Sequence, residues 1–496
     1  MSRLTITTKP AEGAATPAGV EAFGYRQELK RSLSPFDLLV YGLVFIAPIG
    51  PWSAFGFVFN ASHAMVPLVY VMGLVAMMFT ALSYMTMSAA FPVAGSVYAY
   101  AGRGIGERAG FLAGWALLLD YLLLPTLIYV VCAVGVHAVF PVLPRPLLVV
   151  VFLAFNTAIN LSGIEGTARL SVILLALQLG LLALFVVLGL VALAHGVNGA
   201  HWTLAPLYDA HKVSPSLIFG ALSLAVLSFL GFDGISTLTE EAKGGARAVG
   251  LATMLSLLVA GVLFIAQTYL ASLFVLGRHP FTPGDEAATA FYIVAGTVGG
   301  DAFRFVVSIL GVLFSGLAAA LAAQAATARL LYSMARDNML PKALAHIGAK
   351  RQAPDRAILL TAAITLVLGL CLVNQLELLT TLVNFGALSG FLALHLSVVI
   401  HFMVRKRSAL WIRHLAVPAT GFVIVAYVMI SAQGNAKIAG LCWMAVGLVT
   451  VLVLKARGRP RGGLLDQEPF QSPRSGEPAQ AGSPGRAGPE SPRIGE

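Results

Sequence analysis

The chain has 496 residues, of which 58% are hydrophobic and only 11% are charged, and its mean hydropathy is +0.85. Soluble domains carry about 25% charged residues, so this composition excludes an ordinary soluble protein and indicates a polytopic membrane protein. The formal net charge of +10 does not indicate nucleic-acid binding, because the basic residues cluster in short loops between apolar runs. All three cysteines lie in apolar runs, so neither a disulfide framework nor a zinc site is expected.

The polar N-terminal segment, residues 1–34, precedes the first apolar run, which begins at Phe36. This arrangement predicts no cleavable signal peptide, and residues 1–34 are expected to be cytoplasmic. A helix needs about 20 apolar residues to cross the hydrocarbon layer, and this criterion predicts twelve transmembrane helices. The predicted spans are 36–58, 66–90, 110–139, 146–163, 170–194, 216–239, 249–276, 303–333, 357–374, 378–403, 412–431 and 436–455.

Lys and Arg are concentrated in alternate loops, including those around residues 103–108, 243–247, 336–356 and 405–413. The intervening loops hold few basic residues, so the positive-inside rule places the basic loops and both termini on the cytoplasmic side of the cell membrane. An even number of spans agrees with that orientation. Residues 457–496 are rich in Pro, Gly and Ser and are predicted to form a disordered cytoplasmic tail.

Helix-breaking residues interrupt two of the predicted spans. The first span contains residues 47–51 (APIGP), and the sixth contains residues 231–234 (GFDG). Because five spans separate these breaks, the second set of five would enter the membrane from the opposite side and bring both breaks to one interface. The pattern predicts a ten-helix transport core, 35–404, of two inverted repeats, 36–194 and 216–403, followed by helices 11 and 12 within 405–456. Simple kinks remain the alternative interpretation.

Asp233 is the leading candidate for a substrate contact. A charged residue at the bilayer centre costs about 2.5–3.5 kcal/mol, so a carboxylate there needs a compensating role. At the break it can meet an ammonium group, which the open carbonyls of the preceding half-helix also attract. A proton-carrying or helix-capping acid is the alternative. Phe232 can contact an amine or its methylene chain, although an aromatic ring on a helix commonly serves packing.

Asp120 lies about eleven residues into the third span, roughly 16 Å along the helix, and is therefore also near the middle of the membrane. A diamine carries two cations separated by an apolar chain, so two spaced carboxylates with aromatic rings between them would suit it. Hydrogen bonding of Asp120 to neighbouring helices is an equally open interpretation. Tyr121 and Tyr129 cannot both face the same way as Asp120, because their offsets differ from its direction by about 100° and 180°.

The coupling ion is predicted from the oxygen atoms available. A sodium site needs several oxygen ligands, and the relevant stretch of the eighth span offers only Ser315, so proton coupling is preferred. Glu240 and Glu241, like the two aspartates, can carry the proton. With Lys243 and Arg247 nearby, the glutamates are also interpreted as a cytoplasmic ion-pair cluster. Exchange of one organic cation for another remains open.

Three motifs resemble those of the amino acid, polyamine and organocation permease superfamily. They are residues 91–100 (FPVAGSVYAY), residues 328–341 (ARLLYSMARDNMLP), and residues 232–234 (FDG) leading to 240–243 (EEAK). The resemblance covers about residues 34–455 and implies a leucine-transporter-like fold of two inverted five-helix repeats plus two helices. Residues 114–122 and 229–237 look most like the bacterial putrescine importers. The resemblance also implies an approach of Asn384, Phe385 and Gly386 to the site.

Two prolines depart from the family pattern at the first break. Permeases for amino acids usually offer backbone N–H groups there to the substrate carboxylate, and Pro48 and Pro51 remove two such donors. The sequence therefore favours an ammonium group at Asp233, while an amino acid permease, working by proton symport or exchange, remains the alternative. The predicted substrate-binding residues are Ala47, Pro48, Ile49, Gly50, Asp120, Tyr121, Gly231, Phe232, Asp233, Gly234 and Ile235. Candidates for coupling or gating are Ser315, Glu240, Glu241 and Phe385.

These features together predict a secondary active importer of putrescine or a related amine, which works by alternating access and proton coupling. A membrane-embedded enzyme is a remote alternative, because the chain has no zinc-protease, nucleophile-elbow or phosphate-loop motif and no soluble domain large enough for a cofactor. The protein is therefore expected not to be an enzyme and to use no cofactor or metal. Its oligomeric state cannot be predicted from one sequence.

Overall fold

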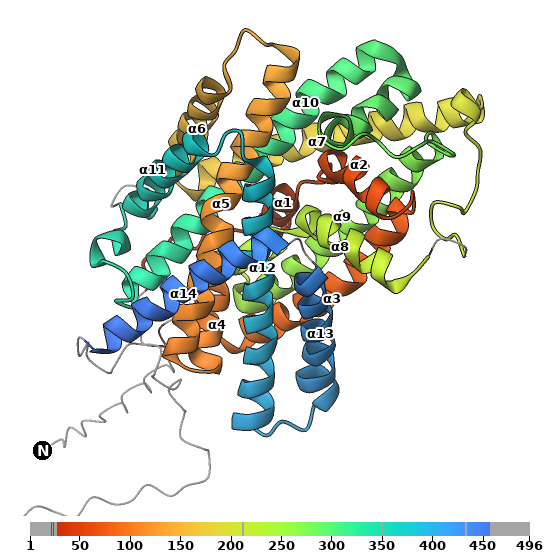
Figure 1. The fold of residues 1–496 in the computed structure, drawn as a ribbon. Coiled ribbons are helices and arrows are strands. Elements are labelled where there is room, and N and C mark those ends of the chain that lie inside the picture. Colours follow the sequence, from red (N-terminus) through yellow and green to blue (C-terminus); the bar gives the residue numbers. More distant parts are fainter. Residues whose placement is uncertain are drawn as a thin grey trace, which may run out of the picture.

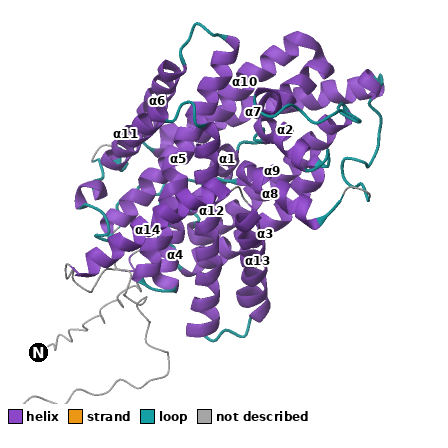
Figure 2. Ribbon diagram, viewed as in Figure 1, coloured by secondary structure: helices purple, strands orange, loops and turns teal. Residues whose placement is uncertain are grey.

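The computed structural model describes residues 21, 23, 27–210, 213–348, 351–431 and 434–456. Over these residues the chain is a bundle of helices joined by loops, with no strand among the described elements (Figure 1, Figure 2). The predicted tail, 457–496, lies outside the described residues, as does most of the segment before residue 27. The prediction of an all-α polytopic fold is confirmed.

The helices follow the predicted spans closely. In the first half they are α1 (Pro35–Ile46), α2 (Pro51–Ala61), α3 (Val66–Ala90), α4 (Ser96–Gly104), α5 (Glu107–Val139), α6 (Arg145–Leu161) and α7 (Ile164–Ala194). In the second half they are α8 (Pro215–Phe229), the 3-10 helix η3 (Phe232–Leu238), α9 (Gly245–Leu273), α10 (Asp285–Arg336), α11 (Asp355–Cys371), α12 (Leu376–Val398), α13 (Val417–Ser431) and α14 (Gly434–Ala456).

Two α-helical segments were not among the predicted spans. The helix α4, toward the lower end of the bundle in Figure 1, has only nine residues, too few to cross a membrane. The long α10 is interrupted at Gly300, where φ is 77°, so residues 285–299 form a separate helix before the predicted eighth span. Both segments lie in stretches that hydropathy alone assigns to loops.

The number of membrane crossings remains a prediction. Within the described residues, eight helices are long and apolar enough to cross a membrane, or nine when α1 and α2, which meet at a bend of 50°, are counted as one span. The apolar stretches of α6 and α14 fall below that length. Each of the twelve predicted spans nevertheless coincides with a helix or with a broken pair of helices.

Proline chemistry produces the first break. Pro48 has no N–H group and disfavours the helical conformation of the residue before it, and Ala47 indeed adopts φ 60° and ψ 104°. The N–H of Gly50 then donates to the carbonyl of Ala47 over 2.7 Å, which closes a tight turn. Pro51 begins α2 at the first helical position, where a missing N–H costs nothing.

Glycine chemistry produces the second break. The helix α8 ends at Phe229, Leu230 is extended, and Gly231 adopts φ 113°, a conformation that side chains with a Cβ atom rarely tolerate. The chain then continues as η3. The two breaks lie against each other, because the space next to Gly231 and Gly234 is filled by Phe45, the penultimate residue of α1. This contact is what an inverted repeat with its breaks at one interface predicts.

We expect Gly231→Ala to destabilise the protein. A Cβ atom at residue 231 would lie 2.8 Å from the carbonyl carbon and ring of Phe45, and the positive φ adds strain of about 1–3 kcal/mol. Thermal unfolding of the purified protein in detergent measures the effect. Gly220→Ala in α8 is the matched control, because no atom lies within 4 Å of that added methyl group. Equal unfolding midpoints for the two variants would contradict this account of the break.

The helix α2 contacts the segment after α9. The amide of Asn60 donates to the carbonyl of Phe281 over 2.7 Å and accepts from its N–H over 2.8 Å. In the same region Trp52 stacks on Phe291 with ring centroids 4.6 Å apart. Residues 281–299 are therefore attached to α2, the helix that follows the first break.

Candidate substrate site between the two helix breaks

Asp233 lies in the first turn of η3, directly after the second break, and is only 2% exposed. Its Oδ2 accepts a hydrogen bond from the hydroxyl of Tyr121 over 2.7 Å, and its Oδ1 accepts one from the N–H of Gly231 over 3.3 Å. No basic side chain in the described part of the chain forms an ion pair with it. A cationic ligand would supply the missing positive charge.

Tyr121 connects α5 to the break, and its side chain is 1% exposed. Its carbonyl accepts a hydrogen bond of 2.5 Å from the hydroxyl of Thr327 on α10, which fixes this turn of α5. Tyr121 reaches Asp233, whereas the buried hydroxyl of Tyr129 has no hydrogen-bond partner among the described residues.

Asp120 is also buried, with 2% exposure. Its Oδ1 forms no hydrogen bond with any described residue, so the alternative in which neighbouring helices satisfy this oxygen is not observed. The backbone of Asp120 is fixed by α12, since a Cβ atom at Gly386 would lie 2.5 Å from the Asp120 nitrogen. This contact brings Gly386 to the candidate site, as the family resemblance implies.

Phe232 lies in an aromatic cluster between three elements. Its ring centroid is 5.9 Å from that of Tyr84 on α3 and 5.7 Å from that of Phe391 on α12. Its ring therefore packs within the bundle, beside the carboxylate of the next residue. Tyr84 and Phe391 could not be singled out from the sequence, because they are ordinary aromatic residues within long apolar helices.

At the first break, the predicted residues Ala47 and Ile49 are buried and Gly50 is half-buried. The carbonyl of Pro48 lies at the break and accepts a hydrogen bond of 2.8 Å from the side-chain amide of Gln267 on α9. This partner was missed in the sequence, although a glutamine within an apolar helix is a signal for such a contact. Ile235 points toward α1, where it fills the space beside Gly42.

Two candidates for coupling or gating lie apart from these contacts. Ser315 is half-buried in α10, and its hydroxyl forms no hydrogen bond within the described ranges. The ring of Phe385 packs against Gly440 of α14, so it faces the last helix while its neighbour Gly386 contacts Asp120.

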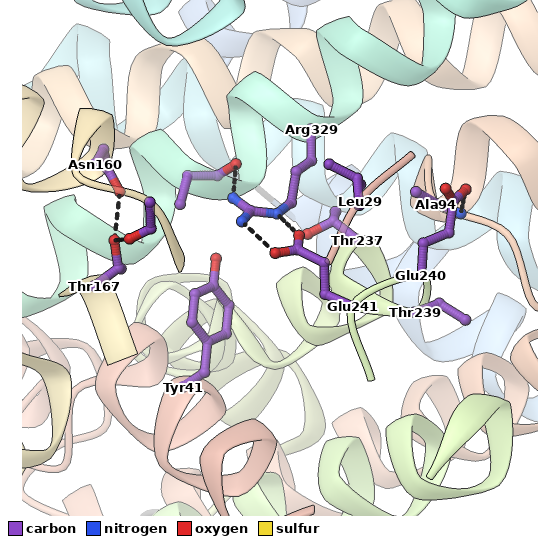
Figure 3. A network of polar contacts seen from close by, with 12 residues as sticks. Leu29, Tyr41, Ala94, Asn160, Thr167, Thr237, Thr239, Glu240, Glu241 and Arg329 are labelled. Carbon is purple, nitrogen blue, oxygen red and sulfur yellow. Dashed lines mark hydrogen bonds and ion pairs between the residues drawn. The ribbon is translucent and has the colours of Figure 1, made fainter. Parts of the chain in front are cut away.

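Glu240 and Glu241 form ion pairs, as one interpretation of the sequence predicts, but their partners differ from those expected. Glu241 accepts from Arg329 Nε over 2.5 Å and from Nη2 over 3.1 Å (Figure 3). Glu240 accepts two bonds from Arg336, of 2.9 and 2.8 Å. The expectation of a cluster with Lys243 and Arg247 was wrong because α10 brings its own arginines to this end of η3.

The three motifs behind the family resemblance meet at this ion-pair cluster. The N–H of Ala94 donates to Glu240 Oε1 over 2.9 Å, and Ser333 Oγ donates to the carbonyl of Ala94 over 3.0 Å. The segment before α1 lies beside this cluster. The Leu33 N–H donates to the carbonyl of Glu241, and the Leu33 carbonyl accepts from the backbone N–H of Lys243. The segment before α1 therefore contacts the residues that follow η3.

Broken helices that meet at a buried carboxylate, within an all-helical membrane bundle, are the arrangement of a membrane transporter. The chain belongs to the amino acid permease family, whose model matches residues 38–453. It is 34% identical over 437 residues to the low-affinity putrescine importer PlaP of Escherichia coli K12, and this alignment covers 86% of this chain and 93% of the relative. It is 24% identical over 456 residues to the branched-chain amino acid permease BcaP of Bacillus subtilis, covering 87% and 94%. A methylthioribose transporter of Bacillus subtilis is 26% identical over 456 residues, covering 85% and 92%.

Proposed function

We propose that this permease is a secondary active transporter that imports putrescine or a related small amine by alternating access, with proton coupling. The cation is bound at Asp233, between the two helix breaks. Residues 35–404 are the transport core, with 405–456 as two accessory helices, and both termini lie on the cytoplasmic side of the cell membrane. This assignment fits the positive-inside distribution of Lys and Arg.

The observation that carries the proposal is the buried Asp233 carboxylate, which has two hydrogen-bond donors and no cationic partner in the described chain. A substrate ammonium group would form a charge-assisted hydrogen bond there. The putrescine importer among the relatives supports an amine as substrate. At the first break, the Pro48 carbonyl is occupied by Gln267, and the prolines leave fewer N–H donors for a carboxylate.

Proton coupling is proposed from the side chains that could bind a sodium ion or carry a proton. The hydroxyl of Ser315 forms no hydrogen bond with the first break within the described ranges, and a sodium site would need several oxygen ligands there, which supports a proton as the coupling ion. Asp233 and Asp120 are then the candidates for carrying the proton, whereas Glu240 and Glu241 are held in ion pairs.

Uptake by proteoliposomes tests this function. We expect labelled putrescine to accumulate when an inward proton gradient is imposed, and accumulation to stop when a protonophore dissipates the gradient. A competition panel with unlabelled diamines and amino acids then identifies the substrate class. Inhibition by branched-chain amino acids without inhibition by any diamine would instead establish the alternative, an amino acid permease, which the relative BcaP favours.

A further inference from the structure

Asp120 presents a buried oxygen that the fold leaves unused. Its Oδ1 is shielded from solvent and has no donor at hydrogen-bond distance among the described residues. Leaving a buried acceptor unsatisfied costs about 1–3 kcal/mol, and more when the group is charged. The neighbouring carboxylate of Asp233, by contrast, accepts two hydrogen bonds. A ligand that donates to Asp120 would remove the cost.

Tyr121 links the two carboxyl groups. It is the residue after Asp120 on α5, and its hydroxyl donates directly to Asp233 over 2.7 Å. Successive residues of a helix point about 100° apart, so the Asp120 carboxyl group leaves α5 in a different direction from the Tyr121 side chain. Asp120 therefore offers a second acidic group that is separated from the first.

The position of Asp120 is fixed. Gly386 of α12 packs so closely on α5 that an added Cβ atom would lie 2.5 Å from the Asp120 nitrogen and 3.1 Å from its Cβ atom. The side chain starts from a backbone that cannot shift away from the site. A fixed carboxyl group at a set separation from another one can discriminate ligands by the distance between their charges.

Apolar and aromatic groups lie beside the carboxyl groups. The rings of Phe232, Tyr84 and Phe391 contact one another, with centroids between 5.7 and 6.2 Å apart. Phe232 is the residue directly before Asp233. Aromatic rings accommodate methylene groups and attract cations at their faces, so they suit the chain between two ammonium groups.

We propose that Asp120 is the specificity-determining residue that binds the second ammonium group of a diamine whose first ammonium group is held by Asp233. The inference rests on the proposed function and deepens it, since it assigns the site to dications over monocations. In the ligand-free protein the Tyr121 hydroxyl occupies Asp233 Oδ2, and the first ammonium group takes its place. An amino acid or a monoamine leaves Asp120 Oδ1 without a donor.

The test compares two probes with the same four-carbon chain that differ by one ammonium group, 1,4-diaminobutane and butylamine. Isothermal titration calorimetry with the purified full chain in detergent gives both dissociation constants. We expect the wild-type protein to bind the diamine about 10- to 100-fold more tightly, the range of one charge-assisted contact. In Asp120→Asn this ratio should fall to about one to three, because the lost contact is the one that only the diamine makes.

Two further variants keep the test decisive. Asp120→Glu retains the charge on a longer side chain and should shift the preference toward 1,3-diaminopropane, which also covers the case in which Asp120→Asn fails to fold. Glu377→Gln, at the exposed start of α12, removes the same charge outside the site and should leave the ratio unchanged.

The outcomes separate the two proposals. A wild-type protein that binds neither amine overturns both the amine-transport function and the role of Asp120. A wild-type protein that binds the two amines equally, or an Asp120→Asn variant that keeps the diamine preference, overturns the role of Asp120 alone.

Discussion

Asp233→Asn is expected to lower the initial rate of putrescine uptake by about 100-fold. The carboxylate is the one proposed contact for the first ammonium group, and a charge-assisted hydrogen bond is worth about 1.5–3 kcal/mol, or roughly 10- to 150-fold. Asparagine also places an N–H₂ group where the Gly231 N–H or the Tyr121 hydroxyl now donates to oxygen. The variant therefore loses both the charge and one acceptor.

The measurement is uptake by proteoliposomes at equal protein density, with thermal unfolding as the control for folding. Tyr121→Phe is the matched variant, because it removes the 2.7 Å hydrogen bond to Asp233 but leaves the charge. Its uptake should fall by less than about 10-fold, because the carboxylate that binds the ammonium group is kept and the ammonium group replaces the Tyr121 hydroxyl as donor. Full uptake by a folded Asp233→Asn protein would remove Asp233 from the substrate site.

The helix breaks could be predicted from the sequence because their causes are local. Proline removes a donor and restricts the residue before it, and Gly231 allows a positive φ, so the interruption after Ile46 and the one after Phe229 are properties of a few consecutive residues. Hydropathy located the spans for a similar reason, since each helix must supply its own apolar length. The contact of the two breaks through Phe45 is the one that the predicted inverted repeat requires.

The partners of the buried charged and polar groups could not be predicted in the same way. Arg329 is separated from Glu241 by 88 residues and Gln267 from Pro48 by 219. Such pairs depend on how helices rotate about their axes, and a span that is apolar on all sides gives no periodicity from which to read that rotation. The loop residues Lys243 and Arg247 were expected as partners because they are near the glutamates in the sequence, whereas the fold selects arginines of α10.

The ion pair of Glu241 and Arg329 should have the largest effect on stability. Their side chains are 2% and 5% exposed, and removing one member of a buried pair leaves an uncompensated charge that costs about 3–5 kcal/mol. We therefore expect Glu241→Gln to lower the thermal unfolding midpoint by several degrees. The pair of Lys30 and Glu165, with side chains 56% and 63% exposed, is the matched control, and Glu165→Gln should leave the midpoint unchanged.

A double variant tests whether the loss of stability in Glu241→Gln comes from the unpaired charge of Arg329. If the loss in Glu241→Gln comes from an isolated buried guanidinium, then adding Arg329→Gln should restore part of the midpoint, because two neutral amides can hydrogen-bond to each other. If the two single effects simply add, the pair is not coupled and the charge argument is wrong. Because this pair ties the end of η3 to α10, the same proteins also report on transport. Partial recovery of stability without recovery of putrescine uptake would mean that the cycle needs the ion pair itself, beyond its contribution to folding.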